Sequence, residues 1–136
     1  MLNTRIQIPD THRDLLDTNV GILATTGKDG YPQVTALWFL FDEDGLVKLY
    51  LNETRQKLKN LRAHQECTFF IIDRANPLRT LEIRARAELK PDPQYTLVKK
   101  FDQKYSADIR KMDPPGQSRV LVTLHPVKVN ATDLSK

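Results

Sequence analysis

A strict alternation of apolar and charged side chains over residues 81–89 is the strongest constraint on the fold. The apolar positions are Leu81, Ile83, Ala85, Ala87 and Leu89, and the charged ones are Glu82, Arg84, Arg86 and Glu88. A period of two places successive side chains on opposite faces of a β-strand. The pattern therefore predicts a strand with one face on a core and the other in water.

Other segments extend this strand into a sheet. Residues 20–26, 33–41 and 47–51 are rich in β-formers and are separated by two segments that each contain an Asp-Gly turn signal, which predicts a three-stranded antiparallel meander. We expect a fourth strand at 67–73 and a sixth at 119–124. We expect a last strand at 127–131, after an interruption at His125-Pro126.

Short helices are expected between the strands. Start signals and apolar periodicity predict helices at 11–16, 55–64 and 94–105, the first of them within an N-terminal segment 1–18. The polar residues 132–136 should form a flexible tail. Together these elements predict one domain over 1–136, mainly β with short helices. The expected architecture is a six- to seven-stranded antiparallel split β-barrel of Greek-key type.

Composition and motifs exclude several classes of function. No apolar run approaches the length of a membrane-spanning helix, and the first nine residues lack a signal-peptide core, so we expect a cytoplasmic protein without a membrane partner. Cys67 is the only cysteine, and we expect it to be a buried structural thiol. Histidine and cysteine spacings predict no metal site, and the glycine-rich phosphate loops and the hydrolase motif are absent.

The predicted strand at 33–41 is apolar on both faces. One face carries Val34, Ala36, Trp38 and Leu40, and the other carries Leu37, Phe39 and Phe41. A barrel interior covers only one face of a strand, so the outer face needs another cover. A partner subunit or a flat aromatic ligand would provide it.

A basic cluster opens the predicted helix at 55–64. Arg55, Lys57, Lys59 and Arg62 follow Asn52 and Thr54. Free N–H groups, the positive end of the helix dipole and these cations suit a phosphate monoester. The alternative is a solvated basic helix face that only aids solubility.

These segments together resemble the split-barrel flavin-binding superfamily typified by pyridoxamine 5′-phosphate oxidase. The resemblance rests on residues 21–34, on 35–45, and on 52–62 with its pattern Arg55-x-Lys57-x-x-Asn60-Leu61-Arg62. It covers about 15–129 and is strongest for the small single-domain branch of F420-dependent oxidoreductases. Arg55-Gln56-Lys57 stands where the oxidase has Ser-Arg-Lys, and the oxidase's C-terminal extension has no counterpart, so we do not expect pyridoxamine phosphate oxidation.

The resemblance implies a cofactor site. The ring of FMN or F420 would lie along Val34, Thr35, Ala36, Leu37 and Trp38. The phosphate would be held by Leu51, Asn52, Arg55 and Lys57, with Asn60 supporting the helix start. Members of the superfamily are typically homodimers with the cofactor at the subunit interface, so a partner chain would complete the pocket.

The leading hypothesis is a flavin- or deazaflavin-dependent oxidoreductase. It would transfer a hydride between bound FMN or F420 and a small conjugated organic substrate, with no obligatory catalytic side chain. The first alternative is a non-catalytic flavin or haem binding or storage protein of the same fold. The second is a basic barrel that binds nucleic acid, which is disfavoured because the aromatic residues lie in apolar rather than basic surroundings.

Overall fold

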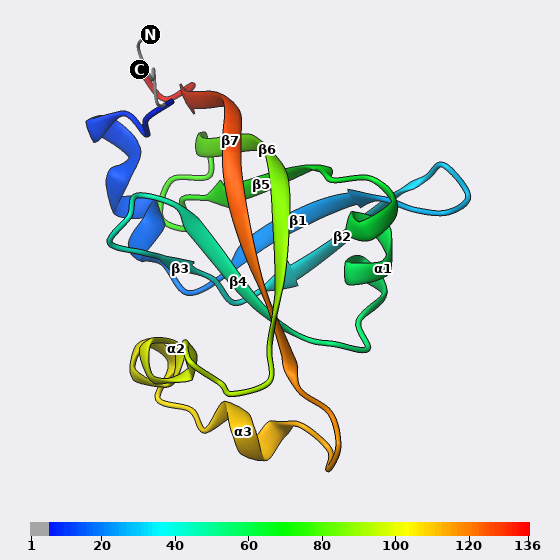
Figure 1. Cartoon of the computed structure of the whole chain (residues 1–136). Coiled ribbons are helices and arrows are strands. Elements are labelled where there is room, and N and C mark those ends of the chain that lie inside the picture. The colour runs from blue at the N-terminus through cyan, green and yellow to red at the C-terminus, as the bar shows by residue number, and fades with distance from the viewer. Residues whose placement is uncertain (1–5) are drawn as a thin grey trace, which may run out of the picture.

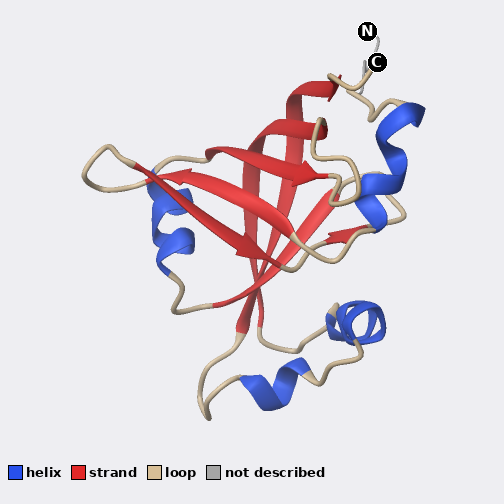
Figure 2. Cartoon of the chain, turned by 180° about the vertical axis from the view of Figure 1, so that it is seen from behind, coloured by secondary structure: helices blue, strands red, loops and turns tan. Residues whose placement is uncertain are grey.

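The structure, a computed structural model, describes residues 6–136 and is mainly β, as the sequence predicts. All strand pairings in this part of the chain are antiparallel, and the sheet order is β2-β1-β5-β6-β7-β4-β3. The strands are β1 (Gly21–Thr26), β2 (Pro32–Leu37), β3 (Leu40–Phe41), β4 (Val47–Asn52), β5 (Glu66–Ile72), β6 (Arg79–Asp92) and β7 (Arg119–Asp133). Figures 1 and 2 show that the sheet curls into a half-open barrel.

The helices are short and lie around the barrel. They are the 3-10 helix η1 (Asp10–Asp17), α1 (Gln56–Ala63), α2 (Val98–Tyr105) and α3 (Ile109–Met112). Helix α1 lies beside β1 and β2, whereas α2 and α3 form a separate layer below the barrel (Figure 1). The first five residues of the N-terminal segment 1–18 lie outside the described residues.

Helix α2 is shorter than the sequence predicts, so the expected start at residue 94 was wrong. Tyr95 has a φ of 55°, in the left-handed region, and an α-helix cannot continue through such a residue. The backbone N–H of Tyr95 instead bonds to the carbonyl of Asp92 in a turn. Helix α2 therefore begins only at Val98.

The predicted strand at 33–41 is broken at Trp38-Phe39, so the simple meander was also wrong. Its first part, β2, pairs with β1, and its last two residues form β3, which pairs with β4. Strands β2 and β3 are the two edges of the sheet although they follow each other in the chain. The break thus carries the chain from one edge to the other and brings the edges of the curled sheet together.

Strand β7 is longer than predicted and contains the expected interruption. His125 and Pro126 pair with Arg86 and Ala85, and a register shift next to this pair accommodates the proline. The strand continues to Asp133, and the N–H of Leu134 bonds to the carbonyl of Leu78. Thr132 and Asp133, the first residues of the predicted tail, therefore belong to β7 and pair with Thr80 and Arg79 of β6.

The barrel core follows the alternation that the sequence shows. On β6, Leu81, Ile83 and Ala85 are buried, and the charged residues between them point outward. Phe39 and Phe69 are fully buried and pack edge to face, with ring centroids 5.0 Å apart. Cys67 is buried as expected, and this burial raises the pKa of its thiol to about 12, which keeps the thiol protonated.

Gly21 leaves space for the ring of Phe69, which predicts a stability defect on substitution. A Cβ atom at residue 21 would overlap the buried Phe69 ring, which also packs edge to face against the buried Phe39. We expect Gly21→Ala to lower the free energy of unfolding by about 1–3 kcal/mol, as overpacking does. Urea denaturation measures the loss. The additional change Phe69→Leu should recover part of it, and an unchanged denaturation midpoint in Gly21→Ala would contradict the contact.

Candidate functional site

The outer face of β2 is apolar and exposed. Val34 is 61% exposed and Trp38 37%, and Ala36 between them is also exposed. The register continues this face onto β1, where Ala24 lies opposite Val34 and Ile22 lies opposite Ala36. Thr35 and Leu37 point to the other side and are half-buried. The face that the sequence predicts to need a cover is thus uncovered in the single chain.

Helix α1 begins next to this strand with an unpaired cation. Lys57 lies in the first turn, is only 9% exposed, and its ammonium has no hydrogen-bond or ion-pair partner among residues 6–136. Burial and the neighbouring charge of Arg55 both lower its pKa. Arg55 precedes the helix and is exposed, also without an anionic partner in the described chain. An anion here would relieve both the desolvation and the repulsion.

Asn60 connects this helix to strands β1 and β2. Its side-chain amide donates to Thr25 Oγ1 over 3.0 Å and to Gln33 Oε1 over 3.1 Å. Its Oδ1 accepts from Gln56 over 3.1 Å. Thr25 lies on β1 and Gln33 on β2, so Asn60 ties the middle of α1 to both strands of this hairpin.

Asn52 lies at the end of β4 in a buried hydrogen-bond network. Its Oδ1 accepts from the N–H and hydroxyl of Thr54, and its amide donates to Asp113 Oδ1 (2.9 Å) and Gln117 Oε1 (3.1 Å). Asp113 also accepts from Arg119 and Tyr95. The network thus joins the loop before α1 to the segment that carries α2 and α3.

A hollow of about 690 Å³ lies between the β1–β2 hairpin and the start of α1. Its lining residues are Gly27, Lys28, Asp29, Tyr31, Pro32, Gln33, Gln56 and Asn60. Lys28 adds a third cation without a partner among the described residues near the first turn of α1. This hollow does not include the Val34–Trp38 face, so a ligand spanning both would extend beyond it.

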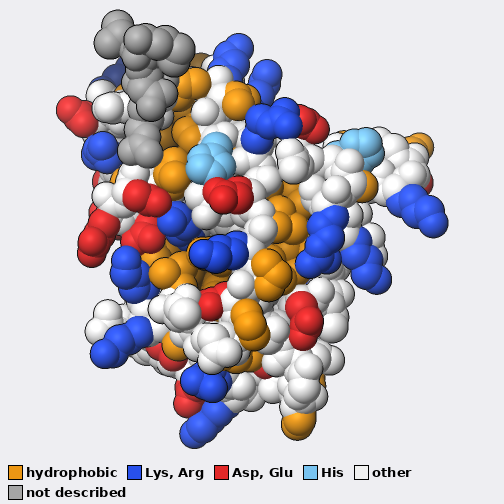
Figure 3. All heavy atoms as spheres, in the orientation of Figure 1, with side chains coloured by type: hydrophobic (Ala, Val, Ile, Leu, Met, Phe, Trp, Pro, Cys, Tyr) orange, Lys and Arg blue, Asp and Glu red, His pale blue; other side chains and the backbone are white. Residues whose placement is uncertain are grey.

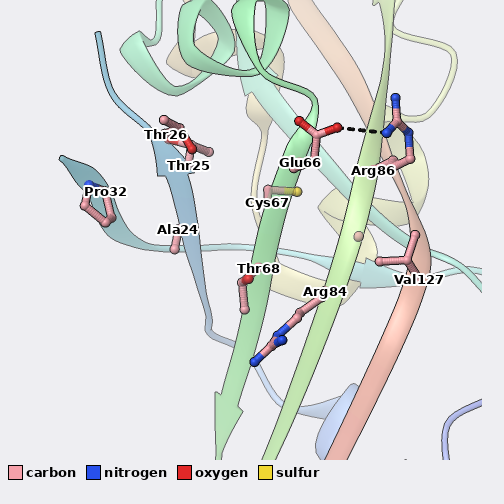
Figure 4. A pocket seen from close by; sticks show the side chains of 11 residues that line it. Ala24, Thr25, Thr26, Pro32, Glu66, Cys67, Thr68, Arg84, Arg86 and Val127 are labelled. Carbon is pink, nitrogen blue, oxygen red and sulfur yellow. Dashed lines mark hydrogen bonds and ion pairs between the residues drawn. The ribbon is translucent and has the colours of Figure 1, made fainter. Parts of the chain in front are cut away.

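A second hollow, of about 480 Å³, lies on the outer face of the sheet (Figure 4). Small side chains form part of its lining, and Arg84 and Arg86 from β6 border it. Both arginines already form ion pairs, Arg84 with Glu82 at 3.2 Å and Arg86 with Glu66 at 2.8 Å. None of the predicted cofactor-binding residues lines this hollow, and its cations are neutralised within the chain.

The break after β2 is held by α2. The N–H of Phe39 donates to the Tyr105 hydroxyl over 2.9 Å, and Lys104 Nζ donates to the carbonyl of Phe39 over 2.7 Å. Trp38 stacks on Tyr105. The apolar periodicity that predicts a helix at 94–105 does not indicate this contact of Tyr105. The hydroxyl is the feature that distinguishes it from a core phenylalanine.

Lys104 is expected to make stability depend on pH in the alkaline range. Burial lowers its pKa to about 8 in the folded protein, against about 10.4 for an ordinary lysine. Between these values the unfolded chain binds more protons, so the Lys104 contribution to folding stability rises with pH. We expect the difference in unfolding free energy between the protein and Lys104→Met to increase from pH 8 to pH 10. Urea denaturation at several pH values measures it, Lys99→Met on the same helix gives the baseline, and a constant difference would contradict it.

Charges on the visible surface are mixed. In Figure 3 basic side chains are spread over the face seen in Figure 1, with acidic and apolar side chains between them. Within residues 6–136, no group of three or more His, Cys, Asp or Glu side chains is arranged to hold a metal ion. No helix in this part of the chain is both long and apolar enough to cross a membrane.

A sequence model of one family matches nearly the whole chain. It is the model described as pyridoxamine 5′-phosphate oxidase, and it matches residues 8–133. The chain belongs to the pyridoxamine 5′-phosphate oxidase family. No match is found among the curated proteins.

The structure is similar to several solved structures of the same fold. One is described as an F420 reductase, with 31% identity and a TM-score of 0.77 over 90% of this chain and 98% of that one. A conserved hypothetical protein, Rv2991 of Mycobacterium tuberculosis, is 22% identical with a TM-score of 0.76, covering 98% and 89% of the two chains. HupZ of Group A Streptococcus is 17% identical with a TM-score of 0.70, covering 92% and 94%. The last two show the fold alone.

Proposed function

We propose that this protein binds FMN or F420 and uses it to transfer a hydride to or from a small conjugated organic substrate. The observation that carries the proposal is Lys57, whose side chain is packed in the first turn of α1 while its ammonium reaches the surface without a partner among residues 6–136. Partial desolvation and the charge of Arg55 disfavour this cation, and an anionic ligand would offset both effects. Its position beside an exposed apolar strand fits a phosphate attached to a flat ring.

Different residues of the chain would bind the phosphate and the ring of the cofactor. Lys57 and Arg55 hold the phosphate, with the free N–H groups at the start of α1 and the helix dipole adding to their charge. Val34, Ala36 and Trp38 offer an apolar surface to the ring, and the β2 backbone, including that of Thr35, would bond its polar edge. Asn60 keeps these two parts in register through Gln33.

The bound cofactor would supply the hydride chemistry, and the protein supplies its orientation and the exclusion of water. No side-chain acid or base is assigned in this scheme. The family membership and the 31% identity to a protein described as an F420 reductase support a redox cofactor. The proposal leaves both FMN and F420 as candidates, because each carries a phosphate and a tricyclic ring.

We further propose that the protein acts as a homodimer with the cofactor at the subunit interface. The outer face exposes Val34 (61%), Val20 (46%) and Ile72 (40%), and such apolar side chains on one sheet face favour burial against another chain. A second copy would cover this face and close the ring site from the other side. Analytical ultracentrifugation of the full chain measures this, and a monomer at micromolar concentration would contradict it.

The direct test is a titration of the purified, cofactor-free protein with FMN and with F420 in parallel. Fluorescence reports the binding, and an absorption spectrum of the protein as isolated shows any retained cofactor. We expect saturable binding of at least one of them, followed by turnover of conjugated acceptors with the reduced form. Failure of both to bind would overturn the proposal. Binding without turnover of any acceptor would leave the non-catalytic binding or storage alternative.

A further inference from the structure

Trp38 and Tyr105 form a stacked pair at the end of the proposed ring site. Their ring centroids are 4.2 Å apart and the rings are within 5° of parallel. Tyr105 covers one side of the indole, while Trp38 as a whole stays 37% exposed. Trp38 does not have the surroundings of a core aromatic residue, because a core side chain is buried on all sides and this indole lies at the end of an exposed strand.

The Tyr105 hydroxyl fixes the backbone next to the indole. It accepts from the N–H of Phe39 over 2.9 Å and lies 2.7 Å from the carbonyl oxygen of Asn19 and 2.9 Å from that of Phe39, so its proton goes to one of these carbonyls. Phe39 is fully buried while the preceding Trp38 points outward. The hydroxyl therefore satisfies backbone groups that the break between β2 and β3 leaves without strand partners.

Helix α2 is anchored to the barrel independently of Trp38. Phe101 is 1% exposed and stacks on Tyr50, with centroids 5.2 Å apart and an interplanar angle of 20°. Lys104 adds a second bond to the carbonyl of Phe39 and lies 3.9 Å above the Phe39 ring. Tyr105 is therefore carried by an anchored helix and can fix the orientation of the Trp38 indole.

We infer that Tyr105 is a positioning residue that holds Trp38 as a wall of the ring pocket, in line with Val34 and Ala36 on the outer side of β2. The inference rests on the proposed function, since it assigns the indole to the ring of FMN or F420. Tyr105 itself does not touch the ring. It acts by ring stacking on one side of Trp38 and by its hydroxyl bonds to the neighbouring backbone.

The first part of the test needs no ligand, because Trp38 is the only tryptophan in the chain. Tyr105→Leu removes the stack and the hydroxyl, and we expect a red shift of the Trp38 emission and stronger quenching by acrylamide. Tyr105→Phe keeps the stack but loses the hydroxyl bonds, so its emission and quenching should change less than those of Tyr105→Leu. Tyr31→Phe, at a side chain that is 76% exposed, is the control and should change neither.

The second part separates the ring from the phosphate by comparing FMN with riboflavin, and F420 with its dephosphorylated deazariboflavin core. We expect Tyr105→Phe to weaken each phosphate-bearing ligand and its phosphate-free counterpart by the same factor, about threefold to tenfold, the range of one lost hydrogen bond. Tyr105→Leu should add a further loss of similar size from the missing stack. A general loss of fold would also lower the thermal midpoint, which is measured alongside.

The outcomes distinguish this inference from the proposed function. If the unaltered protein binds neither ring, the proposed function fails and the inference fails with it. If the protein binds a ring and Tyr105→Phe and Tyr105→Leu bind it equally well, only the inference is overturned. Unchanged Trp38 emission in folded Tyr105→Leu would overturn it as well.

Discussion

Replacing Lys57 with alanine is expected to weaken binding of the phosphate-bearing cofactor by about 1.5–3 kcal/mol, the range of a charge-assisted hydrogen bond. The reason is the position of Lys57: its side chain is packed in the first turn of α1, and its ammonium reaches the surface with no anion among the described residues to bind. Because burial and Arg55 already lower its pKa, removing the charge costs the unliganded fold little. Titration of the variant with FMN and F420 measures the loss.

Lys59 provides the matched control for this change. It lies two residues further along the same helix, is exposed, and points away from the buried side of Lys57. Lys59→Ala removes the same charge from the protein and should leave cofactor affinity within about twofold, since exposed charges are screened by water and salt. Equal losses in the two variants would show a diffuse charge effect, and an unchanged affinity in Lys57→Ala would remove Lys57 from the phosphate site.

Replacing Asp113 with alanine is expected to lower the free energy of unfolding by about 3–5 kcal/mol, the range for breaking one partner out of a buried ion pair. The Asp113 side chain is 2% exposed and that of Arg119 is 13% exposed, and they lie 2.8 Å apart. The change would leave the Arg119 guanidinium without its carboxylate and remove acceptors from Asn52 and Tyr95. Urea denaturation of the variant measures the loss.

Low pH should cause part of the same loss in unfolding free energy. Burial alone would raise the pKa of Asp113, but hydrogen bonds from Arg119, Asn52 and Tyr95 outweigh it and hold the pKa below its usual range. The stabilisation is therefore complete above the unfolded value of about 3.9 and is lost as the pH falls through the lower folded value. Asp108→Ala is the control, because its exposed pair with Lys111 spans 3.7 Å and should contribute less than about 1 kcal/mol. Equal stability of the two variants would contradict the buried network.

Local patterns in the sequence determined the secondary structure and the chemistry available to it. The alternation at 81–89 depends only on neighbouring residues, and β6 confirms it. The cations at the start of the 55–64 helix could be recognised for the same reason, since helix N-terminal signals are local. The burial of Cys67 also follows from the apolar run beside it.

Long-range pairing decided what the sequence could not. A continuous apolar run at 33–41 is compatible with one long strand, and only the pairing of its two halves with β1 and β4 breaks it at Trp38-Phe39. Similarly, Pro126 predicts an interruption of the last strand. A register shift in the pairing with β6 accommodates the proline, and β7 continues beyond it.

The partners of polar side chains were also decided by the tertiary structure. Asn52 and Asp113 are 61 positions apart in the chain, and nothing in the local pattern of either indicates the other. Likewise, Lys57 reads as one of four similar cations in the sequence, and only the packing of α1 against the barrel buries it alone while Lys59 stays in water. Periodicity specifies which face of an element is buried, whereas the desolvation of one charge and the partner of one amide depend on how distant elements meet.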